Sequence, residues 1–94
     1  MAVQTLELHI EATPGIKNGK PRIAGRRITV ENIVIWHEWM GIHVDEIATQ
    51  YDLTLAQIYA ALSYYFDHRE EVNDSIKRSQ TFTDVLKKEI PSKL

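Results

Sequence analysis

The sequence VDEIATQYDLTLAQIYAALSYYF, which spans residues 44 to 66, decides the fold. Apolar side chains recur at helical spacing in both of its halves, and Asp52 and Leu53 interrupt the period between them. Thr54 followed three residues later by Gln57 is a capping-box pattern, in which both side chains satisfy backbone N–H groups at the start of a helix. The stretch therefore predicts two short helices joined by a tight turn, and small Ala48 on the inner face favours a helix-turn-helix.

The composition is that of one modest domain. The chain has 94 residues, of which 44% are hydrophobic and 26% are charged, so a single core is expected. We assign residues 1–66 to a β arm plus helix-turn-helix and residues 67–94 to a C-terminal helical extension of the same domain. The lack of cysteine excludes disulfides, thiolate zinc sites and a cysteine nucleophile. No apolar run approaches the roughly 20 residues of a membrane span, so a soluble, cytoplasmic protein without a membrane partner is expected.

Charge is unevenly distributed along the chain. The formal net charge is -2, yet residues 1–30 carry five basic and two acidic side chains, whereas residues 31–94 carry six basic and eleven acidic ones. The basic side chains of the first part fall in one short stretch without an acid: Lys17, Lys20, Arg22, Arg26 and Arg27. This arm would supply most of the attraction to a polyanion. The alternative is a solvated sheet edge that discourages strand pairing.

The N-terminal third predicts a small β arm followed by a helix. Leu6, Leu8 and Ile10 alternate with polar residues, which indicates one half-buried strand. The short segments 22–23 and 27–29, with a glycine between them, predict a hairpin. From residue 30 the pattern is helical, with Thr29 as the expected N-cap and Gly41 as the expected end.

The C-terminal part predicts two further helical segments. Residues 67–80 are polar with sparse apolar positions, which indicates a helix that lies on the surface or projects from it. Residues 81–90 carry an apolar stripe that Pro91 ends. The expected partner-binding residues are those of the stripe: Phe82, Val85, Leu86 and Ile90. Such an amphipathic helix favours dimerisation or capture of another protein, although the stripe would also fit folding back on the domain.

These motifs together carry a family resemblance. The matching positions in the arm are Ile16, Asn18-Gly19-Lys20-Pro21, Ile23, Gly25, Arg27-Ile28 and Val30. Those in the helical stretch are Gly41, Glu46-Ile47-Ala48, Tyr51, Leu53-Thr54, Ile58 and Ala61-Leu62. The combination, over about two thirds of the chain, resembles the bacterial family known as domain of unknown function four hundred thirty-three.

The resemblance implies a mainly α fold, namely a homeodomain-like helix-turn-helix preceded by a short β arm. It also implies a VapB-type antitoxin of a toxin–antitoxin operon, with a PIN-like toxin and its own operator DNA as partners. Two positions depart from the family pattern: Arg26 stands where threonine is common, and His43 stands where serine or threonine usually caps the first helix of the motif.

A helix-turn-helix would read DNA with the outer face of its second helix. The predicted DNA-binding residues are Lys20, Arg22, Arg26 and Arg27 in the arm, and Thr54, Gln57, Tyr59 and Ser63 on the helix. Gln57 suits adenine and the hydroxyl groups suit phosphates. No charged residue occurs from residue 54 to 66, so the arm and a homodimer would have to supply the missing attraction.

The alternative function is a protein interaction or dimerisation module without DNA binding, which the uncharged helix and the net acidity favour. The tyrosines on the second helix fit packing in a core or dimer interface as well as binding. Tyr65 is expected in the core, while either role fits Tyr59 and Tyr64.

Enzyme patterns do not fit. His37-Glu38 and His43 lack the four-residue histidine spacing of a zinc helix, and the segment 15–20 lacks the spacing of a phosphate loop. The four histidines form no evident nucleophilic arrangement. We expect no catalytic residue, no metal and no cofactor.

Overall fold

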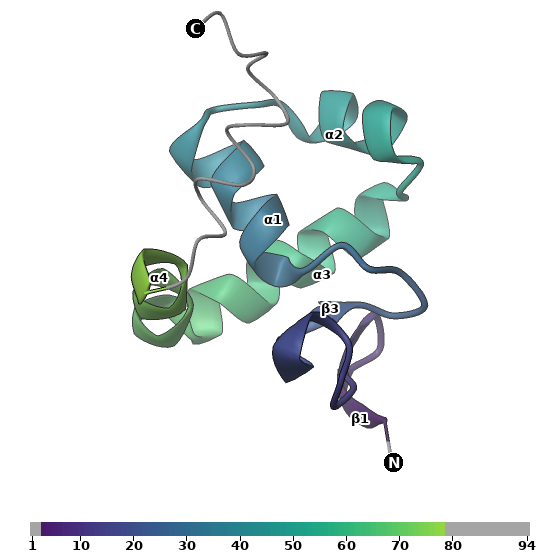
Figure 1. Cartoon of the computed structure of the whole chain (residues 1–94). Helices are drawn as coiled ribbons and strands as arrows, with labels where there is room; N and C mark the ends of the chain where they lie inside the picture. Colours follow the sequence, from purple (N-terminus) through teal and green to yellow (C-terminus); the bar gives the residue numbers. More distant parts are fainter. Residues whose placement is uncertain (1–2, 79–94) are drawn as a thin grey trace, which may run out of the picture.

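A three-stranded antiparallel sheet opens the chain in the computed structural model, which describes residues 3–78 (Figure 1). Strands β1 (Gln4–Glu7), β2 (Ile10–Ala12) and β3 (Arg22–Ile23) lie in the order β1-β2-β3, and a 3-10 turn, η1 (Lys17–Gly19), lies between β2 and β3. The remaining elements are helical, and together they make the described part of the chain mainly α.

The predicted single strand through Leu6, Leu8 and Ile10 is wrong, because the chain reverses within it. β1 ends at Glu7 and a turn at Leu8 and His9 leads into β2. The backbone N–H of His9 donates to the Glu7 carboxylate over 3.0 Å and holds this turn. Leu8 at the tip is 83% exposed, whereas Ile10 is fully buried. The alternation of apolar and polar residues therefore continues through both strands of a hairpin, which is why it predicted a single strand.

The predicted hairpin between segments 22–23 and 27–29 is present only in part. β3 pairs mainly with β2, through Ile10 opposite Ile23. Toward the second segment it makes one bridge, Arg22 with Thr29, and one bond from the Ile23 N–H to the Ile28 carbonyl over 2.8 Å. The bend between them passes through Gly25, whose φ of 78° is in the left-handed region where glycine costs least.

The first helix begins where it was predicted to begin. Thr29 is the N-cap of α1 (Val30–Val34), and its hydroxyl and the Asn32 side chain form a reciprocal capping box. The helix continues into a π-helical turn, η2 (Ile35–Trp39), and the left-handed Gly41 follows it. Trp36 is 6% exposed and its ring stacks on that of Tyr51 at 3.9 Å between centroids.

Helices α2 (Val44–Tyr51) and α3 (Leu55–Asp67) form the predicted helical corner. Asp52 takes the left-handed conformation at the end of α2, with φ 55° and ψ 51°, and Leu53 is buried in the turn. The capping box of Thr54 and Gln57 begins α3, as predicted. Its inner face is buried against the rest of the core through Ile58, Ala61, Leu62 and Tyr65, which confirms the packing role expected of Tyr65.

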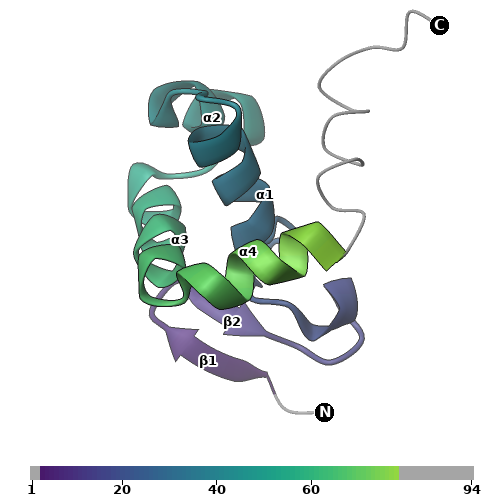
Figure 2. The ribbon, with the colours of Figure 1, turned by 90° about the vertical axis from the view of Figure 1, so that its left-hand side faces the viewer.

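The last described helix, α4 (Arg69–Arg78), lies on the surface of the domain, which was one of the two predictions for this segment. Val72 and Ile76 are 6% and 1% exposed and anchor it to the core. Figure 2 shows α4 crossing the face of the molecule that is turned to the viewer, with α1 above it and the sheet below it. The stripe Phe82, Val85, Leu86 and Ile90 lies outside the described residues. Every helix within residues 3–78 is too short or too polar to cross a bilayer.

Candidate nucleic-acid interface

Arg22, predicted as a DNA contact, lies inside the arm. It is 5% exposed, and its guanidinium donates to the Thr13 hydroxyl over 2.8 Å and to the Arg26 carbonyl over 2.9 Å. The Glu11 carboxylate lies 3.0 Å from the same group. A buried charge is tolerated when it is paired and hydrogen-bonded in this way. Arg22 therefore holds β2, β3 and the bend together.

Arg26 connects the arm to the helical corner. Its Nη1 donates to the Asp52 carbonyl over 2.9 Å and its Nη2 donates to the Tyr51 carbonyl over 2.7 Å. These carbonyls are at the C-terminal end of α2, where backbone acceptors lack helical partners and the helix dipole is negative. The position that departs from the family pattern thus carries a cation that caps α2 from a distant segment.

Lys20 and Arg27 have different surroundings. The ammonium of Lys20 lies 3.2 Å from a carboxylate oxygen of Glu31, a residue that is 4% exposed in the first turn of α1. Ser75 on α4 donates to the other oxygen of that carboxylate. Lys20 therefore faces α4, away from the bend that carries Arg26. Arg27, in contrast, is exposed on the bend beside Arg26.

The outer face of α3 carries the other predicted DNA contacts. The backbone N–H of Gln57 donates to the Thr54 hydroxyl over 3.1 Å, and the backbone N–H of Thr54 donates to the Gln57 side-chain oxygen over 2.8 Å. Both bonds use the side-chain oxygen as acceptor, so the Thr54 hydroxyl hydrogen and the Gln57 amide hydrogens point to no partner within the described chain. Tyr59 is 54% exposed and Ser63 is exposed as well.

Large apolar side chains share this outer face. Leu55 is 42% exposed and Phe66 is 52% exposed, and with Tyr59 they recur at helical spacing along α3. Tyr64 lies toward α4 instead, and its ring stacks on that of His68, the C-cap residue of α3, at 4.1 Å between centroids. The pKa of Tyr64 is raised, first by burial and then by the nearby Glu71 carboxylate.

The predicted site residues thus fall into three groups. Arg26 and Arg27 lie on the bend, and Arg26 reaches the turn that precedes Thr54. Thr54, Gln57, Tyr59 and Ser63 belong to α3. Lys20 and Arg22 have their cationic groups engaged elsewhere, by Glu31 and by Glu11. The role of Arg26 at the helix end was missed, because nothing in the local pattern tells which carbonyls a surface arginine will reach.

Histidines do not gather into a site in the described residues. His37 lies 2.7 Å from Glu38, and His68 lies 2.9 Å from the Tyr64 carbonyl. Within residues 3–78, no group of three or more His, Cys, Asp or Glu side chains is placed to hold a metal ion.

Comparison with known proteins now identifies the family. The sequence model of the family described as "Protein of unknown function (DUF433)" matches residues 10–65, from β2 nearly to the end of α3. The chain belongs to this family. The family membership that the sequence motifs indicated is therefore confirmed. The matched residues end before α4 begins.

A solved structure is similar to this one. The crystal structure of a DUF433 member protein from Anabaena variabilis superposes with a TM-score of 0.69 at 31% sequence identity, over 73% of this chain and 68% of that chain. A search of functionally curated proteins found no match.

Proposed function

We propose that this protein is an antitoxin-like regulator whose helical corner is a homeodomain-like helix-turn-helix that binds operator DNA. The supporting observation is the corner itself. Its second helix presents an exposed face, from Thr54 to Ser63, and the basic bend is fastened beside the start of that helix by Arg26. A helix-turn-helix places the N-terminal part of its second helix in the major groove, so the bend would lie next to the duplex backbone.

Particular groups would make the contacts. The donor hydrogens of Thr54 and Gln57, which the capping box leaves over, suit phosphate oxygens or base edges at the start of α3. Tyr59 and Ser63 would reach the backbone farther along the helix. Arg27 is the exposed arginine of the bend and would supply the main electrostatic attraction. Arg22 is expected to act through the fold of the arm, because its guanidinium is buried.

The antitoxin part of the proposal rests on the family resemblance. A PIN-like toxin is the proposed partner, and the stripe Phe82, Val85, Leu86 and Ile90 is its proposed binding segment. A homodimer would double the DNA contacts and compensate for an uncharged α3.

The experiment is a fluorescence-anisotropy titration with DNA from upstream of the gene and with a scrambled duplex, at several salt concentrations. Arg27→Gln should weaken operator binding and reduce the salt slope by about 1 per lost phosphate contact. Lys77→Gln on α4, which removes the same charge away from the corner, should leave the slope unchanged. Equal and weak binding of both duplexes by the unmodified protein would refute operator recognition.

A second candidate is a protein interaction or dimerisation module without DNA binding. The observation that favours it is the row of exposed Leu55, Tyr59 and Phe66 on an uncharged helix face, which resembles an interface more than a phosphate-binding surface. Analytical ultracentrifugation of the unmodified chain and of Tyr59→Ser discriminates the two. Self-association that Tyr59→Ser abolishes, together with absent operator binding, would favour the second candidate.

A further inference from the structure

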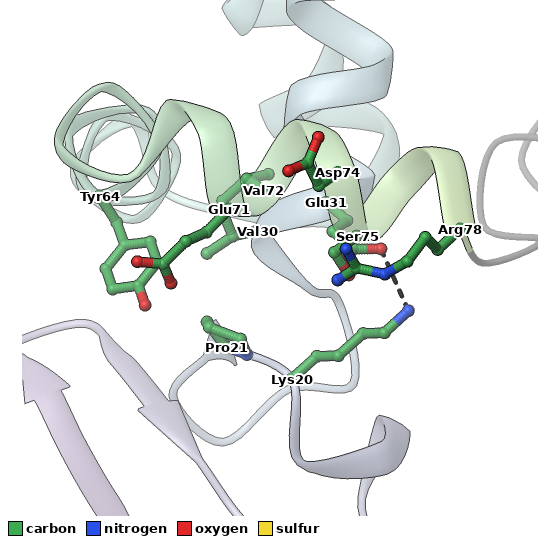
Figure 3. Close-up of a pocket in the computed structure, with 10 residues that line it drawn as sticks. All are labelled: Lys20, Pro21, Val30, Glu31, Tyr64, Glu71, Val72, Asp74, Ser75 and Arg78. Carbon is green, nitrogen blue, oxygen red and sulfur yellow. Dashed lines mark hydrogen bonds and ion pairs between the residues drawn. The ribbon is translucent and has the colours of Figure 1, made fainter.

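A cleft of about 350 Å³ lies between α4 and the loop that leads into β3. Its α4 wall carries Glu71, Ser75 and Arg78, which recur at helical spacing and so share one face of the helix. The opposite wall is formed by Lys20 and Pro21 (Figure 3). The α4 wall lies beyond the residues matched by the family, and the cleft takes no part in the proposed DNA contacts.

The two ends of the cleft have opposite polarity. Figure 3 shows the Tyr64 phenol and the Glu71 carboxylate at one end, and the side chains of Lys20 and Arg78 at the other. The Tyr64 hydroxyl lies beside Glu71 at this end, and its oxygen can accept a hydrogen bond. One end is therefore suited to an ammonium group and the other to a carboxylate.

Apolar surface lies between these ends. Pro21, Val30 and Val72 line the middle of the cleft, and Figure 3 shows them between the two polar ends. Glu71 and Arg78 are seven residues apart on α4, which corresponds to about 10 Å along the helix axis. A bound molecule that contacts both ends must therefore place its two charges several bonds apart, with an apolar segment between them.

The other acidic residues of the cleft do not disturb this pattern. Both carboxylate oxygens of Glu31 are engaged within the wall, one with Lys20 at 3.2 Å and the other as acceptor from Ser75. Asp74 points away from the opposite wall in Figure 3. Because Lys20 already contacts Glu31, the exposed guanidinium of Arg78 is the main cation at its end of the cleft.

We infer that this cleft binds small zwitterions in which an ammonium and a carboxylate are separated by an apolar chain, the class of ω-amino carboxylates. The ammonium would contact Glu71 and Tyr64, the carboxylate would contact Arg78, and the methylene chain would cover Val72 and its apolar neighbours. A six-carbon ω-amino acid spans roughly 8 Å when extended, a distance that side chains can bridge when their backbone positions are about 10 Å apart along α4. A molecule of this size is expected to bind with a Kd of about a millimolar.

The test is an NMR titration of the full-length, ¹⁵N-labelled protein with 6-aminohexanoate, and separately with hexanoate and hexylamine. The first should shift the amides of Lys20, Val72 and Ser75 in a saturable manner. The other two, each of which lacks one charge, should bind about tenfold more weakly, because a charged hydrogen bond is lost. The experiment contains no DNA, so its result is independent of the proposed function.

Matched variants on α4 locate the site. Glu71→Gln and Arg78→Gln should each raise the Kd for 6-aminohexanoate by about fivefold to tenfold. Glu70→Gln and Lys77→Gln, which remove the same charges from residues that do not line the cleft, should change it by less than about twofold. The inference is overturned if 6-aminohexanoate causes no saturable shifts, if hexanoate or hexylamine binds equally well, or if the control variants weaken binding as much as the cleft variants do.

Discussion

Replacing Arg26 by glutamine tests how much this side chain contributes to holding the bend of the arm against the helical corner. The change removes two hydrogen bonds from a guanidinium, at 2.9 Å to the Asp52 carbonyl and at 2.7 Å to the Tyr51 carbonyl. A hydrogen bond to a charged group contributes about 1.5–3 kcal/mol in a buried site. Here one bond is exposed and the other is half-buried, and water can solvate the carbonyls once Arg26 is gone. We therefore expect Arg26→Gln to lower the free energy of unfolding by about 1–2 kcal/mol.

Two further variants separate geometry from charge. Arg26→Lys keeps the cation near the negative end of α2, which contributes about 0.3–1 kcal/mol, but cannot bridge two carbonyls with a fixed fork. The free energy of unfolding of Arg26→Lys should therefore lie between that of the unmodified protein and that of Arg26→Gln. Arg27→Gln removes an exposed arginine from the next position and should change stability by less than about 0.5 kcal/mol.

Urea unfolding at neutral pH, followed by tryptophan fluorescence, measures the effect. Trp36 is a suitable reporter because it stacks on Tyr51, whose carbonyl Arg26 contacts. The slope of free energy against urea should be unchanged, since the surface exposed on unfolding stays nearly the same. If Arg26→Gln unfolds at the same urea concentration as Arg27→Gln, the two hydrogen bonds contribute nothing to stability and the proposed fastening role of Arg26 is refuted.

Two further predictions concern backbone conformation and pH. Asp52 has a φ of 55°, so Asp52→Gly should raise the free energy of unfolding by about 0.5–1 kcal/mol, and urea unfolding showing this variant no more stable than the unmodified protein would contradict this. The pKa of Tyr64 is raised above 10.0 in the folded state, so its contribution to stability is complete below that pH and is lost as the pH rises through the folded-state pKa. Tyr64→Phe should therefore flatten the alkaline loss of stability measured by urea unfolding, and identical pH profiles would show that the native tyrosine is not shifted.

The parts of the fold that could be predicted from the sequence are those that local chemistry determines. Thr29 and Thr54 were assigned as helix starts because a hydroxyl accepts a backbone N–H at short range, and both caps are present. Asp52 interrupts the apolar period and occupies the left-handed position that ends α2. Each of these signals acts over three or four residues, which is the range that a sequence pattern reports reliably.

The hairpin turn at Leu8 could not be predicted by the same reasoning. Alternation of apolar and polar residues is the same for one strand and for two strands that meet at a tight turn, and neither glycine nor proline marks this turn. The alternating pattern assumes that its apolar residues are buried, but Leu8 at the tip of the turn is 83% exposed. The antiparallel pairing of Glu7 with Ile10 establishes the reversal, and the burial of Ile10 opposite Ile23 fixes the second strand through residues that are distant in the sequence.

The three arginines of the arm show why a charge pattern alone does not define a binding surface. In the sequence Arg22, Arg26 and Arg27 are equivalent, but in the fold the first is buried with Glu11 and the second caps α2. Neutralising all three at once would weaken the proposed DNA binding even if none of them touched DNA, because removing Arg22 leaves the Glu11 carboxylate without its cation and destabilises the arm. Of the three, only Arg27 is exposed, and we expect its removal to leave the fold unchanged, so a loss of affinity is informative about phosphate contact only for this residue. Measuring the operator affinity of Arg27→Gln and the free energy of unfolding of Arg26→Gln therefore distinguishes an arginine that contacts DNA from one that stabilises the fold, although the two are adjacent in the sequence.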